Sequence, residues 1–325
     1  MCHKVRRLLP VIVASIACFC SVSAHGEVPV RQDSGEIAEF VNGIINESVN
    51  ANTLFASQES IATGRFTQRQ NSQPDKDYTT IRLPGQLSFG DEGDSVRPFV
   101  EGNGALMRTT AGYNAPDNLG DADFTATSLF ALSAGGGALV RLSDSLTLAP
   151  MASLTYSHIK NRYDFNNEYS QTYLEQYESE LFNWSMDVFT YAPSLKLFYQ
   201  GDLGFAVLNY QVAYTYLFND TISDDSSAID VNSSTGLSSN RIDLLVPTGL
   251  VIDASSWFVR PMFQWNNISG NAVAGLGLRD LYEVGADLVG KILESDSCIS
   301  TVTVGASYVT GDSFEGYHLG AGVTF

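Results

Sequence analysis

The last nine residues carry the clearest hydrophobic pattern of the chain. Every second residue is apolar, and the residues between are small or polar; the apolar positions are Tyr317, Leu319, Ala321, Val323 and Phe325. A period of two places these side chains on one face of a β-strand. A strand with one apolar face and one small or polar face suits a sheet that lies between lipid and a filled interior.

The same alternation recurs after Ala62. Apolar and polar residues alternate in the segments Ile81–Phe89, Ile242–Ile252, Trp257–Trp265 and Tyr282–Ile292. A soluble sandwich also alternates, but here the apolar faces end in aromatic residues, as the interfacial girdles of membrane barrels do. The pattern therefore predicts an all-β, transmembrane antiparallel β-barrel.

The connections between these segments alternate in length. Short polar turns are expected near Gly90–Ser95, Ser143–Ser145, Gly201–Asp202, Asp253–Ser256 and Glu294–Ser297. Longer acidic segments are expected near Arg108–Asp123, Lys160–Glu180, Phe218–Asn240 and Trp265–Gly277, with a tight one at Gly311–Glu315. Short periplasmic turns and long external loops are typical of outer-membrane barrels.

Successive strands cross the membrane in alternate directions, and following them along the sequence predicts a total of twelve strands. The last strand must end in the periplasm, so Thr79–Phe89 runs downward and Gly64–Gln70 is the strand before it. Ten or fourteen strands remain as alternatives, because Phe66 is the only large apolar residue of that first strand. One later strand changes parity: Trp184, Met186 and Val188 are out of phase with Leu195, Leu197 and Tyr199. We therefore expect a bulge between Val188 and Pro193.

The N-terminal residues predict export. Three basic residues precede an apolar run from Leu8 to about Cys20, and Val22-Ser-Ala24 follows as a small-x-small cleavage pattern. This arrangement predicts a cleaved signal peptide over residues 1–24, and the run is too short for a membrane-spanning helix. Cys18 is a weak match to a lipoprotein signal, which is the alternative interpretation.

The next part, residues 25–61, has a helical period. Apolar residues recur at steps of three and four between Asp33 and about Ser57, and Asp33 with Glu36 resembles a capping box. A helix of residues 33–57 would extend about 37 Å, enough to cross a barrel. Five polar side chains exclude contact with lipid: Asn42, Asn46, Glu47, Asn50 and Asn52. The helix is expected inside the pore, or else packed on its own loop in the periplasm. Residues 62–325 form the barrel.

The charge and the cysteines exclude several classes. The full sequence has 18 Lys+Arg and 36 Asp+Glu, a formal charge of −18; cleavage after Ala24 removes three basic residues and leaves 15 against 36, or −21. Such a charge argues against nucleic acid as a partner and leaves no basic stripe. Cys298 is the only cysteine after residue 24, so no disulfide forms within the mature chain.

The helix, the twelve expected strands and the aromatic C-terminus together resemble the β-domain of autotransporters. The resemblance covers about residues 33–325, and its sharpest motif, Tyr317–Phe325, resembles the barrel-assembly signal of outer-membrane proteins. It implies a monomer in the outer membrane of a Gram-negative bacterium, with outer-membrane lipid, lipopolysaccharide and the barrel-assembly machinery as partners. Autotransporters carry an N-terminal passenger, but only about ten residues separate the predicted cleavage site from the helix. A solitary barrel without a passenger is expected.

One face of the strands is assigned to the lumen. Its glycines are Gly135, Gly137, Gly249, Gly285, Gly305, Gly320 and Gly322, which would make room for a helix or let the strands coil. Its charged residues are Arg82, Arg97, Glu101, Arg141, Asp187, Arg241, Asp243, Arg260, Arg279, Glu283, Asp287 and Lys291. They are expected to pair with one another and with the helix, or to line a water-filled pore.

Catalytic and metal-binding patterns are weak. The histidines after residue 24 are His25, His158 and His318, and no His or Cys pair stands at metal-ligand spacing. His158 is expected at the lipid interface, and His318 in the lumen between Gly316 and Gly320 without a side-chain partner. The acidic loops are solvated surface or bridge divalent cations to lipopolysaccharide; they contain Asp117, Asp121, Asp123, Asp220, Asp224, Asp225 and Asp230.

Three functions remain in competition. The first is a helix-plugged barrel with a structural or surface-interaction role, without enzymatic activity and without cofactor. The second is a porin-like diffusion channel with the helix outside the lumen. The third is an outer-membrane enzyme that uses His158 or His318.

Overall fold

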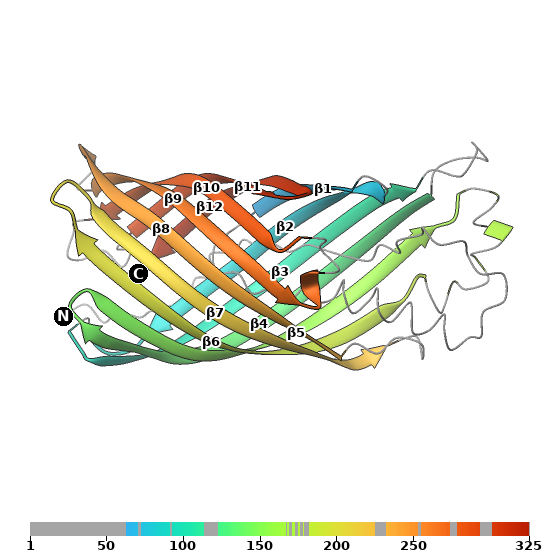
Figure 1. The fold of residues 1–325 in the computed structure, drawn as a ribbon, viewed down its shortest axis with the longest axis horizontal. Coiled ribbons are helices and arrows are strands. Elements are labelled where there is room, and N and C mark those ends of the chain that lie inside the picture. The colour runs from blue at the N-terminus through green and yellow to red at the C-terminus, as the bar shows by residue number, and fades with distance from the viewer. Residues whose placement is uncertain are drawn as a thin grey trace.

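The alternating segments pair with their neighbours in sequence until the last strand returns to the first (Figure 1). The computed structural model describes residues 63–70, 73–91, 93–113, 123–166, 168, 171–172, 175, 178, 182–224, 232–252, 255–273, 278–292 and 301–324. The predicted signal peptide (1–24), the segment 25–61 with its helix at 33–57, and Phe325 lie outside this part.

Twelve antiparallel strands close the barrel, which confirms the expected fold class and strand number. The strands are β1 (Thr63–Gln70), β2 (Gln73–Ser88), β3 (Val96–Tyr113), β4 (Asp123–Ser143), β5 (Leu146–Asp164), β6 (Ser185–Asp202), β7 (Val207–Asp224), β8 (Asn232–Ile252), β9 (Ser255–Gly270), β10 (Asp280–Ile292), β11 (Thr301–Gly311) and β12 (Phe314–Thr324). Within the described residues, no helix is long and apolar enough to span a membrane.

The two ends of the barrel differ in their connections. At the end where β12 finishes, the strands are joined through residues 89–95, 144–145, 203–206, 253–254 and 293–300. At the other end they are joined through 71–72, 114–122, 165–184, 225–231, 271–279 and 312–313. The longest connections lie on the second side, at the right of Figure 1. By the usual asymmetry of these barrels, that end is external and the first is periplasmic.

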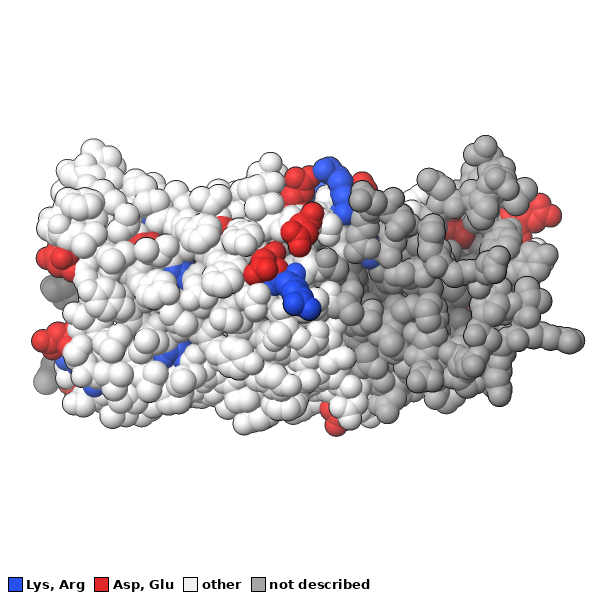
Figure 2. Space-filling model, in the orientation of Figure 1, with Lys and Arg blue, Asp and Glu red and all other residues white. Residues whose placement is uncertain are grey.

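The outward face carries the apolar residues of the alternating pattern. Tyr317 and Leu319 of β12 are 67% and 65% exposed, and Leu132, Val284 and Val304 on other strands are each more than half exposed. So much exposed apolar surface is stable only against hydrocarbon. Figure 2 shows one side of this surface as largely uncharged, with charged side chains gathered toward the external side and at the periplasmic end.

A cluster of apolar side chains lies on the external half of the inward face, among buried polar side chains such as those of Lys76, Thr109 and Asn161. Every one of the twelve strands contributes to a single buried cluster, which we call the apolar collar. Its members are Phe66, Tyr78, Ala105, Met107, Leu129, Ala131, Ile159, Trp184, Met186, Val188, Ala192, Leu217, Leu237, Ile268, Ala272, Leu278, Leu281, Val309 and Phe314. Three of these, Trp184, Ala272 and Leu278, come from the external connections, so the loops complete the packing.

The expected bulge between Val188 and Pro193 is wrong. Residues of even number face inward and residues of odd number face outward throughout β6, so Met186 and Val188 join the collar while Leu195 faces lipid. Both sets are apolar because one packs in the collar and the other contacts hydrocarbon. The register irregularity lies instead in β7, where Ile222 has no partner opposite Asp187 and Val188.

The seam between β1 and β12 closes around an aromatic ring. The register places Phe66 opposite Gly316, and the ring of Phe66 stacks on Phe314 with 5.1 Å between centroids. A Cβ at Gly316 would overlap both this ring and the backbone of Arg65. Glycine is therefore needed at 316 for the ring to lie flat against β12.

Candidate functional site

Below the collar, the inward face becomes charged. Ten of the twelve side chains expected in the lumen have inward parity: Arg82, Arg97, Glu101, Arg141, Arg241, Asp243, Arg260, Glu283, Asp287 and Lys291. Arg141 and Lys291 are exposed near the periplasmic ends of their strands. Arg279 precedes β10 at the external end and is also exposed. We call the buried charged region of the lumen the polar chamber.

Asp187 is the correction to this set. Its register partner is His158, which shares the outward face with Phe130. The misassignment came from the supposed change of parity in β6. Because the strand keeps its phase, Asp187 faces outward and lies outside the polar chamber.

Glu283 is the centre of the polar chamber. Its side chain is 3% exposed, and one carboxylate oxygen accepts a hydrogen bond from Ser307 Oγ at 2.5 Å and contacts His318 Nδ1 at 3.2 Å. Ser307 and His318 are register partners on β11 and β12, so three consecutive strands converge on this carboxylate. His318 was expected to have no side-chain partner, and this expectation is wrong because the partner comes from another strand.

Arg82 enters the same region from β2. The guanidinium is buried and interacts electrostatically with Glu283. Its Nη1 atom has no hydrogen-bond partner among the described residues. A buried donor without a partner is costly, so this position is suited to an acceptor from elsewhere in the chain or to a water molecule.

A second group of ion pairs lies along β8, β9 and β10. Arg260 donates to one carboxylate oxygen of Asp287 from Nε at 2.8 Å and from Nη2 at 2.6 Å. Arg241 lies 3.5 Å from Asp243, which also accepts a hydrogen bond from Asn209 at 2.8 Å. Within the described residues, these four charged side chains of the chamber form two ion pairs with one another.

The sequence interpretation missed two buried lysines. Lys196 on β6 lies 3.9 Å from Glu101 on β3, a strand that is not its neighbour in the sheet, and its side chain is 9% exposed. Lys76 on β2 is also buried, at 2% exposed. Leu195 and Leu197 were expected to face lipid, so the alternation already placed Lys196 between them on the lumenal face, although it was not named among the lumenal residues.

The lumenal glycines have a local explanation. A Cβ at Gly285 would lie 2.5 Å from the Cβ of Ser307, and one at Gly305 would overlap the carboxylate of Asp287. Gly135 and Gly137 are crowded in the same way by residues of β5. Gly320 differs, because nothing lies within 4 Å of the point where its Cβ would stand. Most of these glycines therefore accommodate neighbouring strands.

The outward Asp187 also collects donors. It accepts hydrogen bonds from Ser223 Oγ at 2.6 Å and Tyr156 Oη at 2.7 Å, and His158 Nδ1 lies at 2.8 Å. It lies at the external end of β6, beyond the apolar outward residues Phe189 and Tyr191. The hydrogen bonds, with that from Ser223 contributing most, lower the pKa of Asp187 to about 2.

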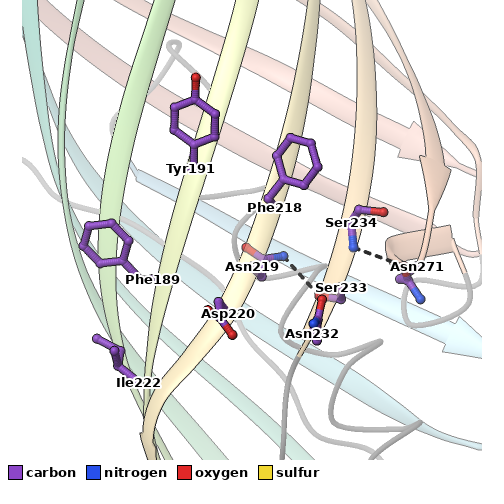
Figure 3. A pocket seen from close by; sticks show the side chains of 10 residues that line it. All are labelled: Phe189, Tyr191, Phe218, Asn219, Asp220, Ile222, Asn232, Ser233, Ser234 and Asn271. Atoms are coloured by element: carbon purple, nitrogen blue, oxygen red, sulfur yellow. Dashed lines mark hydrogen bonds between the residues drawn. The ribbon is translucent and has the colours of Figure 1, made fainter.

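A pocket of about 650 Å³ adjoins this cluster on β6, β7 and β8 (Figure 3). Exposed aromatic side chains form one side, and Tyr191 stacks on Phe218 with 6.3 Å between centroids. Polar groups form the other side, where Ser234 N donates to Asn271 Oδ1 at 3.1 Å. The pocket opens where the apolar surface meets the polar external rim.

These arrangements do not form a nucleophile and base. Ser307 and His318 both face the same oxygen of Glu283, and Ser223 and His158 both face Asp187. Nucleophilic catalysis needs the hydroxyl bonded to the base itself. Within the described residues, no three His, Cys, Asp or Glu side chains lie close enough to hold a metal ion.

Comparison with known proteins identifies the architecture. The family model described as "Solitary outer membrane autotransporter beta-barrel domain" matches residues 48–320. The translocator domain of the autotransporter NalP from Neisseria meningitidis is 10% identical, with a TM-score of 0.54, over 81% of this chain and 86% of that domain. The transport unit of AIDA-I from Escherichia coli is 12% identical, with a TM-score of 0.53, over 88% and 99%. At these identities the two structures support the fold alone. No curated protein gives a significant match.

Proposed function

The chain belongs to the family of solitary outer-membrane autotransporter β-barrel domains, and on that premise we propose that it is a closed barrel with a structural or surface-interaction role. The observation that carries this proposal is the apolar collar. Apolar side chains from all twelve strands form one buried cluster on the external half of the inward face, where buried polar side chains lie between them. An open diffusion channel needs a continuous polar path at that level, and an apolar constriction opposes the passage of water and ions.

The polar chamber below the collar is proposed to hold the helix of residues 33–57. The asparagines expected on that helix can donate to and accept from the paired charges, and an acceptor there would satisfy Arg82 Nη1. The protein would then have two barriers in series, the collar and the helix. In this arrangement the helix is not the only barrier to solutes, because the collar also closes the lumen.

Conductance in planar bilayers tests the two barriers. The intact protein should give little current, and deletion of residues 33–57 should leave it small because the collar remains. Substitution of Met107, Met186 and Leu217 by glycine should also leave it small, whereas combining the two changes should open the barrel. Large single-channel currents from the intact protein would instead favour a diffusion channel.

Crosslinking tests the place of the helix separately. In a Cys298→Ser background, Asn46→Cys and Gly320→Cys should form a disulfide, because Gly320 faces the lumen and leaves room for a side chain. The matched control is Leu319→Cys, which faces outward beside it. Equal crosslinking at 319 and 320, or none at 320, would place the helix outside the lumen.

The proposal includes export, assembly and the lack of catalysis. A signal peptide cleaved after Ala24 would direct export, and the outward residues of β12 with Phe325 would serve the assembly machinery. Deletion of Phe325 should lower the amount of folded barrel in the outer-membrane fraction. Substitution of His158 or His318 by alanine should leave lipid and peptide hydrolysis by the purified protein at background in every case.

A further inference from the structure

Cross-strand register assembles a row of cations on the outward face that is not contiguous in the sequence. Five consecutive strands, β1 to β5, place basic and hydroxyl residues alternately along one line of register partners, and all five side chains are exposed. We call this line the cationic row; its members are Arg65, Thr79, Arg108, Ser128 and Lys160.

Over β2 to β4 the row borders the apolar surface. The next line of partners on its periplasmic side contains Ile81, Leu106 and Phe130, of which the last two are 48% and 39% exposed, and it continues to His158 on β5. The next line on its external side contains Asp77 and Thr110, so the polar surface begins there. Long basic side chains at such an edge extend their charged groups toward the lipid headgroups.

Two of the cations are not neutralised by the barrel. Among the residues that the structure describes, Arg108 and Lys160 form no ion pair, whereas Arg65 lies 3.2 Å from Asp77. Basic residues just outside the row differ. Arg69 lies 2.6 Å from Glu315, and Arg162 lies 3.0 Å from Asp164. The nearest outward carboxylates on the adjoining strands are Asp77, diagonal to Arg108, and Asp187, diagonal to Lys160; Asp77 pairs with Arg65, and Asp187 is held by Ser223, Tyr156 and His158. Arg108 and Lys160 therefore keep their charged groups available to a ligand.

We propose that the cationic row binds the phosphate groups of the outer leaflet's phosphorylated glycolipid, lipid A. Strands lie about 4.8 Å apart, so cations on alternate strands are separated by roughly 10 Å, and the hydroxyls of Thr79 and Ser128 stand between them as further donors. A lipid with two phosphates can meet two such cations at once. The inference depends on the outer-membrane location and not on whether the lumen is closed.

The test is native mass spectrometry of the detergent-purified protein with three lipids: diphosphoryl lipid A, monophosphoryl lipid A and phosphatidylglycerol. The parent protein should bind diphosphoryl lipid A most tightly. The double variant Arg108→Gln, Lys160→Gln should weaken that binding about 25-fold, because each cation at an anionic surface contributes roughly 5-fold. The variant Arg108→Lys, Lys160→Arg keeps both charges and should retain binding within a few-fold.

The matched control removes the same charge from paired positions. Arg69→Gln, Arg162→Gln should change the affinity by less than about 3-fold, since both side chains already have carboxylate partners. An equal loss in this control would show a dependence on net charge alone and would overturn the proposal. So would equal binding of all three lipids, or undiminished binding by Arg108→Gln, Lys160→Gln. All these side chains are exposed, so the variants should fold.

Discussion

The two halves of the lumen are built from the same strands but differ in their buried side chains. The external half contains the apolar collar, in which apolar side chains from every strand pack together with buried polar residues between them. The deeper half is the polar chamber, in which carboxylates such as Glu283 and Asp287 are held by cations and hydroxyls. The members of the collar come from the barrel strands and from the external connections. Among the described residues, Arg82 Nη1 in the chamber and Ser157 Oγ beside the collar have no hydrogen-bond partner. The proposed function assigns closure of the barrel to the collar and a further segment to the chamber.

The largest expected effect is in the collar. Trp184→Ala should lower the free energy of unfolding by about 3–5 kcal/mol, since it leaves a cavity where a 2% exposed ring was packed. Urea unfolding in lipid vesicles, followed by tryptophan fluorescence or by heat-modified gel mobility, measures it. The control is Leu195→Ala on the outward face of β6, which should cost about 1 kcal/mol because lipid fills the space. Equal losses would mean that the collar is not tightly packed.

The next effect is in the polar chamber. Glu283→Gln should cost about 2–3 kcal/mol, because it removes charged hydrogen bonds and the carboxylate with which buried Arg82 interacts electrostatically. The same unfolding assay applies. Glu315→Gln changes an exposed carboxylate that pairs with Arg69, and about 0–1 kcal/mol is expected there. A smaller loss at 283 than at 315 would show that the chamber is open to water.

A smaller effect separates tight from open positions on β12. Gly316→Ala should cost about 1–3 kcal/mol, because the new methyl group overlaps Phe66 at the seam. Gly320→Ala, four residues away on the same inward face, should change stability by about 0.5 kcal/mol or less. If the two variants unfold alike, the packing of the β1–β12 seam differs from that described.

The smallest effect is expected at Asp187, an outward carboxylate that contacts a serine and a histidine, as Glu283 does in the chamber. Asp187 has a pKa lowered to about 2, so its contribution to stability is fully present above the unfolded pKa near 3.9 and is lost as the pH falls through 2. Asp187→Asn should therefore be less stable than the parent protein at about pH 5. The difference in stability between the two proteins should shrink as the pH falls from about 4 to about 2. Unfolding midpoints at these pH values test this. A difference that does not depend on pH would show that the charge of Asp187 is unimportant.

Much of the fold could be predicted because a membrane barrel exposes its alternation in the sequence. The strand number and the weak first strand, Gly64–Gln70, followed from hydrophobic period and connection length. The long connections were expected to be longer than they are: β7 continues to Asp224 and β8 begins at Asn232, inside the loop expected over Phe218–Asn240. The error in β6 has a physical cause. Alternation separates two faces, but it does not identify the lipid face when both sets are apolar, as with Met186 and Leu195.

The candidate sites were less predictable. His318 was expected to lack a partner because its neighbours on β12 are glycines, yet Glu283 reaches it from β10. The cationic row was missed because Arg65, Arg108 and Lys160 lie on three separate strands. Proximity between strands depends on register, which a single alternating strand does not reveal.

The sequence by itself determined that alternating strands form a closed membrane barrel, because one residue in two must be apolar where strands meet hydrocarbon. Only the tertiary structure decided that apolar side chains from every strand cluster in the external half of the lumen, that the side chain of Glu283 contacts residues of two further strands, and that Asp187 faces outward. These features depend on which residues the register places side by side, and a shift of one residue would turn every side chain to the opposite face.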